Sequence, residues 1–136
     1  MRDDSEAEAA RAMILDFLAA QMAGEIDRVA HLIAPDCEIV FTGGRCFASP
    51  AEIAAFNARR YARVAKRMER TDVGRTETGR LVVYSLGALH GAWPDGTPFD
   101  DNRYVDRFEI ADGRIVRWEV WNDSAERLLA RHGIEG

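Results

Sequence analysis

The sequence has few of the residues that build disulfide, metal or phosphate sites. Its 136 residues include two cysteines and three histidines. Cys37 and Cys46 lack the spacing of a zinc site, and the histidines (His31, His90 and His132) are too dispersed to resemble a metal motif. There is also no glycine-rich phosphate loop. We therefore expect free thiols, no metal and no cofactor.

Long apolar runs and an excess of positive charge are missing too. The first ten residues lack the apolar segment of a secretory signal, and no run is long enough to span a membrane, so we expect a cytoplasmic protein. The net charge of −5 argues against nucleic acid or an anionic membrane as a partner. One basic run has helical spacing and is interpreted as a solvated helix face: Arg59, Arg60, Arg63, Lys66 and Arg67.

The composition is that of a soluble globular protein, with 47% hydrophobic and 30% charged residues. A chain of this length can bury about two thirds of its unfolded surface without a disulfide. We expect one domain spanning residues 1–136.

Helix signals come first and strand signals later. A capping box at Ser5 predicts a first helix that stops at Gly24, and a shorter helix follows over 25–33. A strand is predicted over 37–42, and the cap and proline of Ser49-Pro50-Ala51-Glu52 predict a third helix. Four strands then form a meander before a short last helix. This order predicts an α+β fold, in which a mostly antiparallel, strongly curved, cone-shaped sheet wraps on three helices.

The segment Phe99–Asp123 contains the last two strands and their turn. We predict a three-residue loop, 111–113, with its glycine at positive φ. This loop places Asp106 opposite Trp118, whereas a two-residue loop would oppose the like charges of Asp106 and Glu119. The predicted register gives one apolar face that includes an acid: Asn102, Tyr104, Asp106, Phe108, Val116, Trp118, Val120 and Asn122.

These features resemble the nuclear-transport-factor-2-like superfamily, in its SnoaL-like and ketosteroid-isomerase-like branch. The resemblance is carried by the helix break at 24–26, the helix start at 49–56, and the segments 102–108 and 112–115. It implies a cystatin-like fold, a homodimer and a small-molecule pocket inside the cone. Chemistries of the superfamily include isomerisation, cyclisation, epoxide opening and dehydration, and many members have no known activity.

The resemblance also shows which catalytic positions of the family differ in this chain. The oxyanion tyrosine and general-base aspartate of ketosteroid isomerases fall on Phe17 and Phe41, and the last-strand acid of limonene epoxide hydrolases falls on Val120. None of these residues can transfer a proton. A second ketosteroid isomerase acid falls near Tyr104, which could still donate a hydrogen bond. Steroid isomerisation and epoxide hydrolysis by those schemes are therefore disfavoured.

Asp106 is the main catalytic candidate, because a carboxyl group on an apolar face loses hydration and its pKa should rise. The alternative is a structural acid, hydrogen-bonded to Trp118 or paired with an arginine. His90 ends the apolar strand 81–91 and could exchange a proton with Asp106 if its face is the concave one; on the outer face it would be a surface residue. The substrate-binding candidates are Tyr104, Asn102, Tyr61, Asn57, Trp118 and Tyr84.

Two functions remain open. The first is a cofactor-free isomerase, cyclase or dehydratase that uses Asp106 and His90 on a small, largely apolar, planar or polycyclic molecule. The second is a non-catalytic ligand-binding or dimeric assembly protein. An ion-paired Asp106, with His90 outside the cavity, would favour the second. A redox or metal role for the cysteines ranks last. We also expect a homodimer through the outer sheet face, where Trp121 and Val105 lie.

Overall fold

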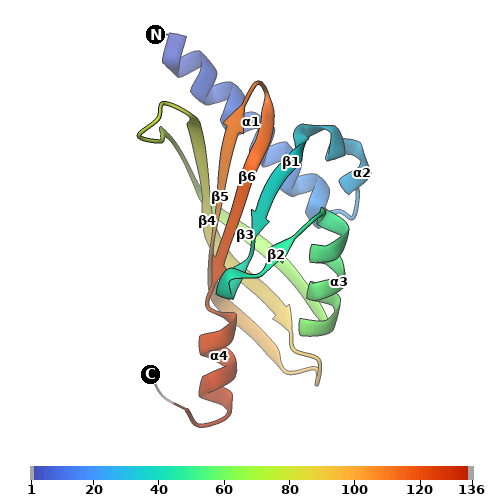
Figure 1. The fold of residues 1–136 in the computed structure, drawn as a ribbon. Helices are drawn as coiled ribbons and strands as arrows, with labels where there is room; N and C mark the ends of the chain where they lie inside the picture. Colours follow the sequence, from blue (N-terminus) through green and yellow to red (C-terminus); the bar gives the residue numbers. More distant parts are fainter. Residues whose placement is uncertain (1, 135–136) are drawn as a thin grey trace.

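The fold combines one sheet with four helices, in a computed structural model that describes residues 2–134, and the side chains of residues 5–134 (Figure 1). The helices are α1 (Arg2–Met22), α2 (Ile26–Val29), α3 (Pro50–Arg60) and α4 (Ser124–Arg131), with 3-10 turns η1 (Ala30–Leu32) and η2 (Thr42–Gly44). The strands are β1 (Ile33–Val40), β2 (Cys46–Phe47), β3 (Arg63–Arg75), β4 (Leu81–Ala92), β5 (Pro98–Ala111) and β6 (Arg114–Asn122). The predicted α+β fold is confirmed.

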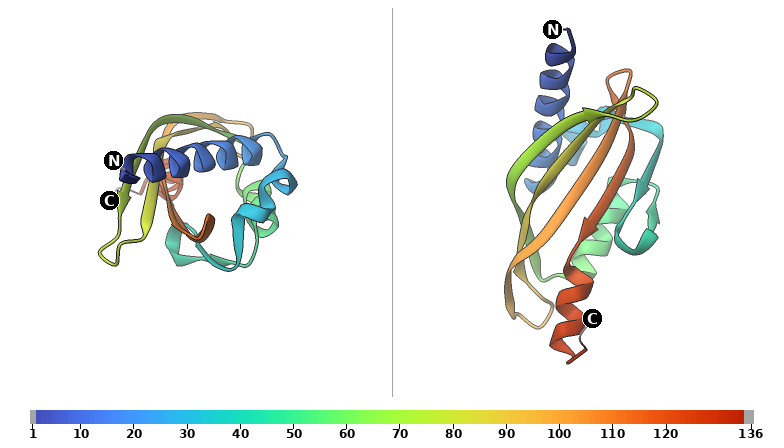
Figure 2. Two further views of the ribbon diagram at one scale, coloured as in Figure 1. Left: turned by 90° about the horizontal axis from the view of Figure 1, so that it is seen from above. Right: turned by 90° about the vertical axis from the view of Figure 1, so that its left-hand side faces the viewer.

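The six strands form one curved sheet in the order β2-β1-β6-β5-β4-β3. Strands β3 to β6 are the predicted antiparallel meander, while β1 runs parallel to β6. The sheet curves around an interior without closing, as seen from above in Figure 2. Helix α4 extends beyond one end of the sheet. Among the described residues, no helix is both long and apolar enough to cross a membrane.

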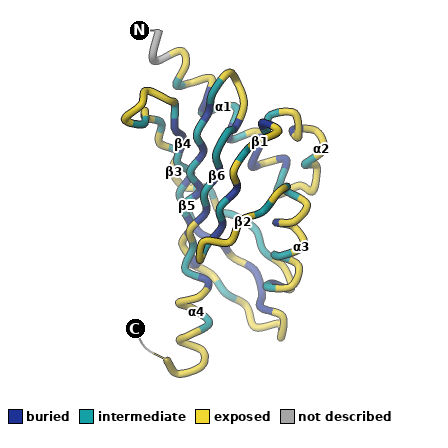
Figure 3. Tube along the Cα trace, in the orientation of Figure 1, coloured by how far each residue is buried: buried dark blue, intermediate teal, exposed yellow. Residues whose placement is uncertain are grey.

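The hydrophobic core lies between α1 and the concave face of the sheet. Phe17 packs edge-on against Phe108 and Trp118, with ring centroids 5.9 and 5.2 Å away. Buried residues run along the middle strands, whereas α4 is mostly exposed (Figure 3). The first helix therefore supplies apolar packing to the sheet.

Helix α3 begins as predicted. The Ser49 hydroxyl accepts a hydrogen bond from the Glu52 amide at 3.4 Å, and the Glu52 carboxylate accepts from the Ala48 amide at 3.2 Å. The helix ends at Arg60, however, so the basic run is not one helical face. The last three residues of the basic run, Arg63, Lys66 and Arg67, lie on β3, where successive side chains point to opposite faces of the sheet. Lys66 therefore reaches the concave side.

The start of the chain differs in detail from the prediction. Helix α1 already begins at Arg2, so Ser5 lies within it and is not its cap. The second helix is shorter than predicted: it ends at Val29, a 3-10 turn follows over Ala30–Leu32, and β1 begins at Ile33 and contains Pro35. Proline cannot donate to a strand ladder, and the pairing of β1 with β6 is irregular between Ile33 and Glu38.

The β5–β6 hairpin has a different turn from the predicted one. Ala111 pairs with Arg114, so the loop contains only Asp112 and Gly113, with φ of 53° and 73°. Positive φ at both positions is the geometry of a type I′ turn, the favoured two-residue hairpin turn. The predicted three-residue loop is wrong.

A bulge near this turn restores the predicted face. The pairing shifts between Glu109 and Ile110, and beyond the shift Asp106 pairs with Val120, and Phe108 with Trp118. The predicted pair of Asp106 with Trp118 is therefore wrong. The residues of the apolar face stay together, except that Ile115 is buried in place of Val116.

Candidate functional site

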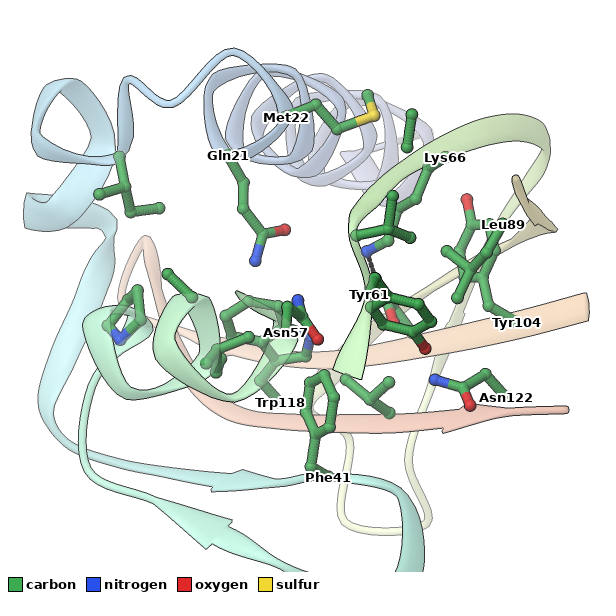
Figure 4. A pocket seen from close by; sticks show the side chains of 18 of the residues that line it. Gln21, Met22, Phe41, Asn57, Tyr61, Lys66, Leu89, Tyr104, Trp118 and Asn122 are labelled. Carbon is green, nitrogen blue, oxygen red and sulfur yellow. Dashed lines mark hydrogen bonds and ion pairs between the residues drawn. The ribbon is translucent and has the colours of Figure 1, made fainter. Parts of the chain in front are cut away.

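A cavity of about 320 Å³ opens on the concave side of the sheet (Figure 4). Its walls come from the end of α1, from α3, and from strands β3, β4, β5 and β6. Most of the wall is apolar, with contributions from Met22, Ile26, Phe41, Ile53, Val64, Leu89, Trp118 and Val120. Such a lining, with a few polar groups, is typical of a small-molecule site.

An ion pair between Lys66 and Asp106 is the main polar feature of the cavity. The Lys66 ammonium donates a hydrogen bond to Asp106 Oδ2, and the two side chains are 15% and 0% exposed. Burial raises the pKa of Asp106 above its ordinary value, although the charge of Lys66 and its hydrogen bond act in the opposite direction. The Lys66 ammonium also lies 5.0 Å from the centroid of the Tyr104 ring.

Lys66 was missed in the sequence because its basic neighbours suggested a helix. No local pattern could have found it, because the apolar residues of this segment are Val64, Ala65 and Met68, and they do not alternate with the polar ones. Across the sheet, Lys66 pairs with Leu89, which also lines the cavity.

Two buried polar atoms in the cavity wall have no hydrogen-bond partner in the described part of the chain, namely Asp106 Oδ1 and Trp118 Nε1. Asp106 is ion-paired, as in the predicted alternative of a structural acid, but its partner is Lys66 and not an arginine or Trp118. Trp118 instead stacks on Phe108, with ring centroids 5.2 Å apart.

The structure brings four of the six predicted substrate-binding residues to the cavity with Asp106: Tyr104, Tyr61, Asn57 and Trp118. The Tyr104 hydroxyl is hydrogen-bonded to Ser85 Oγ at 2.9 Å, and burial raises its pKa to about 12. The Tyr61 hydroxyl lies 2.5 Å from Ser124 Oγ, and burial raises its pKa too. In Figure 4, the amides of Asn57 and Gln21 point into the cavity.

Asn102 is fully buried but does not line the cavity. Its amide donates to Ser124 Oγ at 2.9 Å, the same hydroxyl that bonds to Tyr61. This cluster joins β5 to the start of α4. Asn102 is therefore placed to hold the first residue of α4 at the end of the sheet.

Tyr84 and His90 lie on the outer face of the sheet. Leu89 lines the cavity, so its neighbour His90 points the other way, and His90 is exposed. Tyr84 accepts a hydrogen bond from Arg107 Nε at 3.3 Å on that outer face. The predicted proton exchange between His90 and Asp106 is therefore wrong, because the sheet separates the two side chains.

Both cysteines are free thiols. Burial, together with the neighbouring Asp36 and Glu38, raises the pKa of Cys37 to about 11, while Cys46 is exposed. Among the side chains of residues 5–134, no three or more from His, Cys, Asp or Glu are grouped to hold a metal ion.

Comparisons with known proteins agree with this architecture. Residues 14–118 match the SnoaL-like domain, while none of the curated proteins matches the chain. An NTF2-like protein of unknown function from Burkholderia pseudomallei has a TM-score of 0.71 and 17% identity, over 86% of this chain and 92% of that one. A proposed SnoaL-like polyketide cyclase from a Jannaschia species has a TM-score of 0.69 and 20% identity, over 91% and 92% of the two chains.

A third similar structure is a proposed scytalone dehydratase from Novosphingobium aromaticivorans, with a TM-score of 0.64 and 16% identity over 90% of this chain and 88% of that one. At these identities the structural likeness shows the fold, which is the fold of NTF2-like and SnoaL-like proteins. The family match spans most of the sequence. The chain belongs to the SnoaL-like domain family.

Proposed function

We propose that the chain binds a small, largely apolar molecule in the cavity and anchors a polar group of that molecule at Lys66 and Asp106. The observation that carries this proposal is a mostly apolar cavity of about 320 Å³ with one buried ion pair in its wall. Similar structures named as a polyketide cyclase and a scytalone dehydratase are consistent with small-molecule binding in this fold.

Ligand binding is preferred over catalysis for two structural reasons. Asp106 is held in an ion pair, and His90 lies outside the cavity. A buried acid with a cation attached is a less available base than a free one. These are the two features that distinguish a binding protein from an acid/base enzyme in this sequence.

Blocking the cavity should abolish binding. Both Ala54 and Ala58 are exposed residues of α3, but only Ala54 lines the cavity. With naphthalene as the probe and isothermal titration calorimetry as the measurement, Ala54→Trp should weaken binding at least about tenfold, because the indole fills space that the probe needs. Ala58→Trp should bind like the wild type. Equal binding by both variants would place the ligand elsewhere.

Acid/base catalysis is the second candidate. It is favoured by Asp106 Oδ1, which has no hydrogen-bond partner among the described residues. This oxygen could take a proton from a carbon next to a ligand carbonyl, while the Lys66 ammonium stabilises the enolate oxygen. If so, the protein should accelerate deuterium exchange at the acidic carbon of 2-tetralone, measured by proton NMR. Asp106→Asn should lower this rate at least about a hundredfold. Exchange no faster than in buffer would leave the binding function alone.

We also propose that the outer sheet face pairs two copies of the chain. Trp121 is 50% exposed there and pairs across the sheet with Val105. Beside them, Arg107 contacts Glu109 at 2.5 Å and Glu119 at 2.7 Å. Across a twofold axis, the positive side chains of one copy can contact the negative side chains of the other, while the apolar centres pack together.

The dimer should dissociate when its apolar centre is charged. Trp121→Arg should turn a dimer into a monomer at micromolar concentration in sedimentation velocity, because two new cations would face each other. Leu129→Arg, on the 41% exposed Leu129 of α4, should leave the dimer intact. A wild-type monomer at the same concentration would contradict this proposal.

A further inference from the structure

Two polar atoms in the cavity wall need a partner that the protein does not supply. Asp106 is 0% exposed and Trp118 1% exposed, yet Asp106 Oδ1 and Trp118 Nε1 have no hydrogen-bond partner among the described residues. A carboxylate oxygen only accepts hydrogen bonds, and an indole N–H only donates. Asp106 Oδ1 therefore lacks a hydrogen-bond donor, and Trp118 Nε1 lacks an acceptor.

The two residues lie close together on the same face of the sheet. Asp106 pairs with Val120 and Phe108 with Trp118, which makes Asp106 and Trp118 diagonal neighbours on the concave face of adjacent strands. Diagonal neighbours lie about 7–8 Å apart, within reach of a long or aromatic side chain. Both residues line the same cavity. One ligand group placed between them can contact both.

Resting on the proposed function, we infer that the ligand carries a hydroxyl on a flat apolar ring, as a phenol or an enol does. Its O–H donates to Asp106 Oδ1, and its oxygen accepts from the Trp118 N–H. A hydroxyl is the smallest ligand group that can donate a hydrogen bond to an unpaired acceptor and accept one from an unpaired donor at the same time.

The charges in the cavity explain why the ligand group is neutral. Lys66 already neutralises Asp106 through Oδ2, so a carboxylate ligand would add an uncompensated negative charge next to a buried one. An ammonium ligand would compete with Lys66 for the same carboxylate. A neutral hydroxyl adds a hydrogen bond without changing the charge balance.

Three probes of similar shape separate these contacts. 2-Naphthol can donate and accept, 2-methoxynaphthalene can only accept, and naphthalene can do neither. By isothermal titration calorimetry, 2-naphthol should bind the wild type at least about tenfold more tightly than 2-methoxynaphthalene, because its hydrogen bond goes to a charged group. 2-Methoxynaphthalene should in turn bind about threefold or more tighter than naphthalene.

Two variants assign the contacts to their residues. In the double variant Lys66→Met/Asp106→Leu, the acceptor is gone without an unpaired charge, and the preference for 2-naphthol over 2-methoxynaphthalene should fall below about twofold. Trp118→Phe keeps a ring but removes the N–H, so the affinities of 2-naphthol and 2-methoxynaphthalene should fall by the same factor relative to the affinity of naphthalene for the same variant. If the double variant does not fold, the Trp118→Phe comparison decides.

The outcomes separate this inference from the proposed function. Equal affinities of the wild type for 2-naphthol and naphthalene would overturn the hydroxyl inference and keep the apolar cavity. A full preference for 2-naphthol over 2-methoxynaphthalene in the folded double variant, or over naphthalene in folded Trp118→Phe, would also overturn it. Failure of all three probes to bind would overturn both.

Discussion

Replacing Lys66 alone with Met should destabilise the fold by about 3–5 kcal/mol at pH 7, whereas Lys66→Met/Asp106→Leu should be as stable as the wild type or more so. The single change leaves a fully buried carboxylate without its cation. The double change removes both charges and keeps side chains of similar size. Urea unfolding of the wild type and the two variants measures the difference.

The cost of the single change should depend on pH. Burial holds the pKa of Asp106 above its ordinary value of 3.8, and Lys66 opposes this shift, so removing Lys66 should raise the pKa further. The folded chain then keeps this proton to a higher pH than the unfolded chain. Stability from this group is present below about pH 4 and is lost as the pH rises through the folded pKa. The gap between Lys66→Met and the double variant should therefore widen from pH 4 to pH 7.

An exposed ion pair on the same strand provides the control. Arg70 contacts Asp72 at 3.0 Å on β3, with side chains 66% and 52% exposed. Arg70→Met should cost less than about 1 kcal/mol, because water screens such pairs. A loss of similar size for Lys66→Met at every pH would show that the Lys66–Asp106 pair is not buried in solution.

The order of elements could be predicted because each depends on local signals. The cap at Ser49 and the alternation of β5 and β6 act within a few residues. The prediction of which β5 and β6 residues lie on the concave face was correct, although the predicted turn was wrong. The type I′ turn and the bulge together shift β6 by two residues relative to the predicted register. Side chains alternate with a period of two, so a shift of two leaves each residue on its face.

The partner of Asp106 could not be predicted in the same way. Lys66 is 40 residues away in the sequence and reaches Asp106 only because β4 lies between β3 and β5. His90 was an equally reasonable partner until the face of β4 was known. Contacts of this kind depend on the register of three strands at once, which no local pattern specifies.

Gly87→Ala should destabilise the protein by about 3 kcal/mol, because the backbone of β3 lies too close to Gly87 of β4 to leave room for a side chain. A methyl group at Gly87 would lie 2.0 Å from the Arg67 carbonyl oxygen and 3.0 Å from Tyr104 Cε2. The oxygen belongs to the backbone of the neighbouring strand and cannot rotate away. Removing this clash requires β3 to move, and urea unfolding would measure the resulting loss of stability.

Gly74→Ala is the matched control on the same pair of strands. A methyl group there meets only Val82 Cγ1, at 3.9 Å, which is an ordinary contact. This variant should be unchanged or up to about 1 kcal/mol more stable, because alanine restricts the unfolded chain. Similar stability for both variants would show that β3 can move away from β4 at little cost.

The close approach of β3 to Gly87 also affects the cavity. Gly87 pairs with Met68, two residues after Lys66, and the pairing of β3 becomes irregular just beyond Met68. Lys66 is on β3, so moving β3 away from Gly87 would also move Lys66 relative to Asp106. Naphthalene should bind Gly87→Ala more weakly than Gly74→Ala, at temperatures where both variants are folded. A folded Gly87→Ala with wild-type affinity would show that the cavity does not depend on this close approach of the two strands.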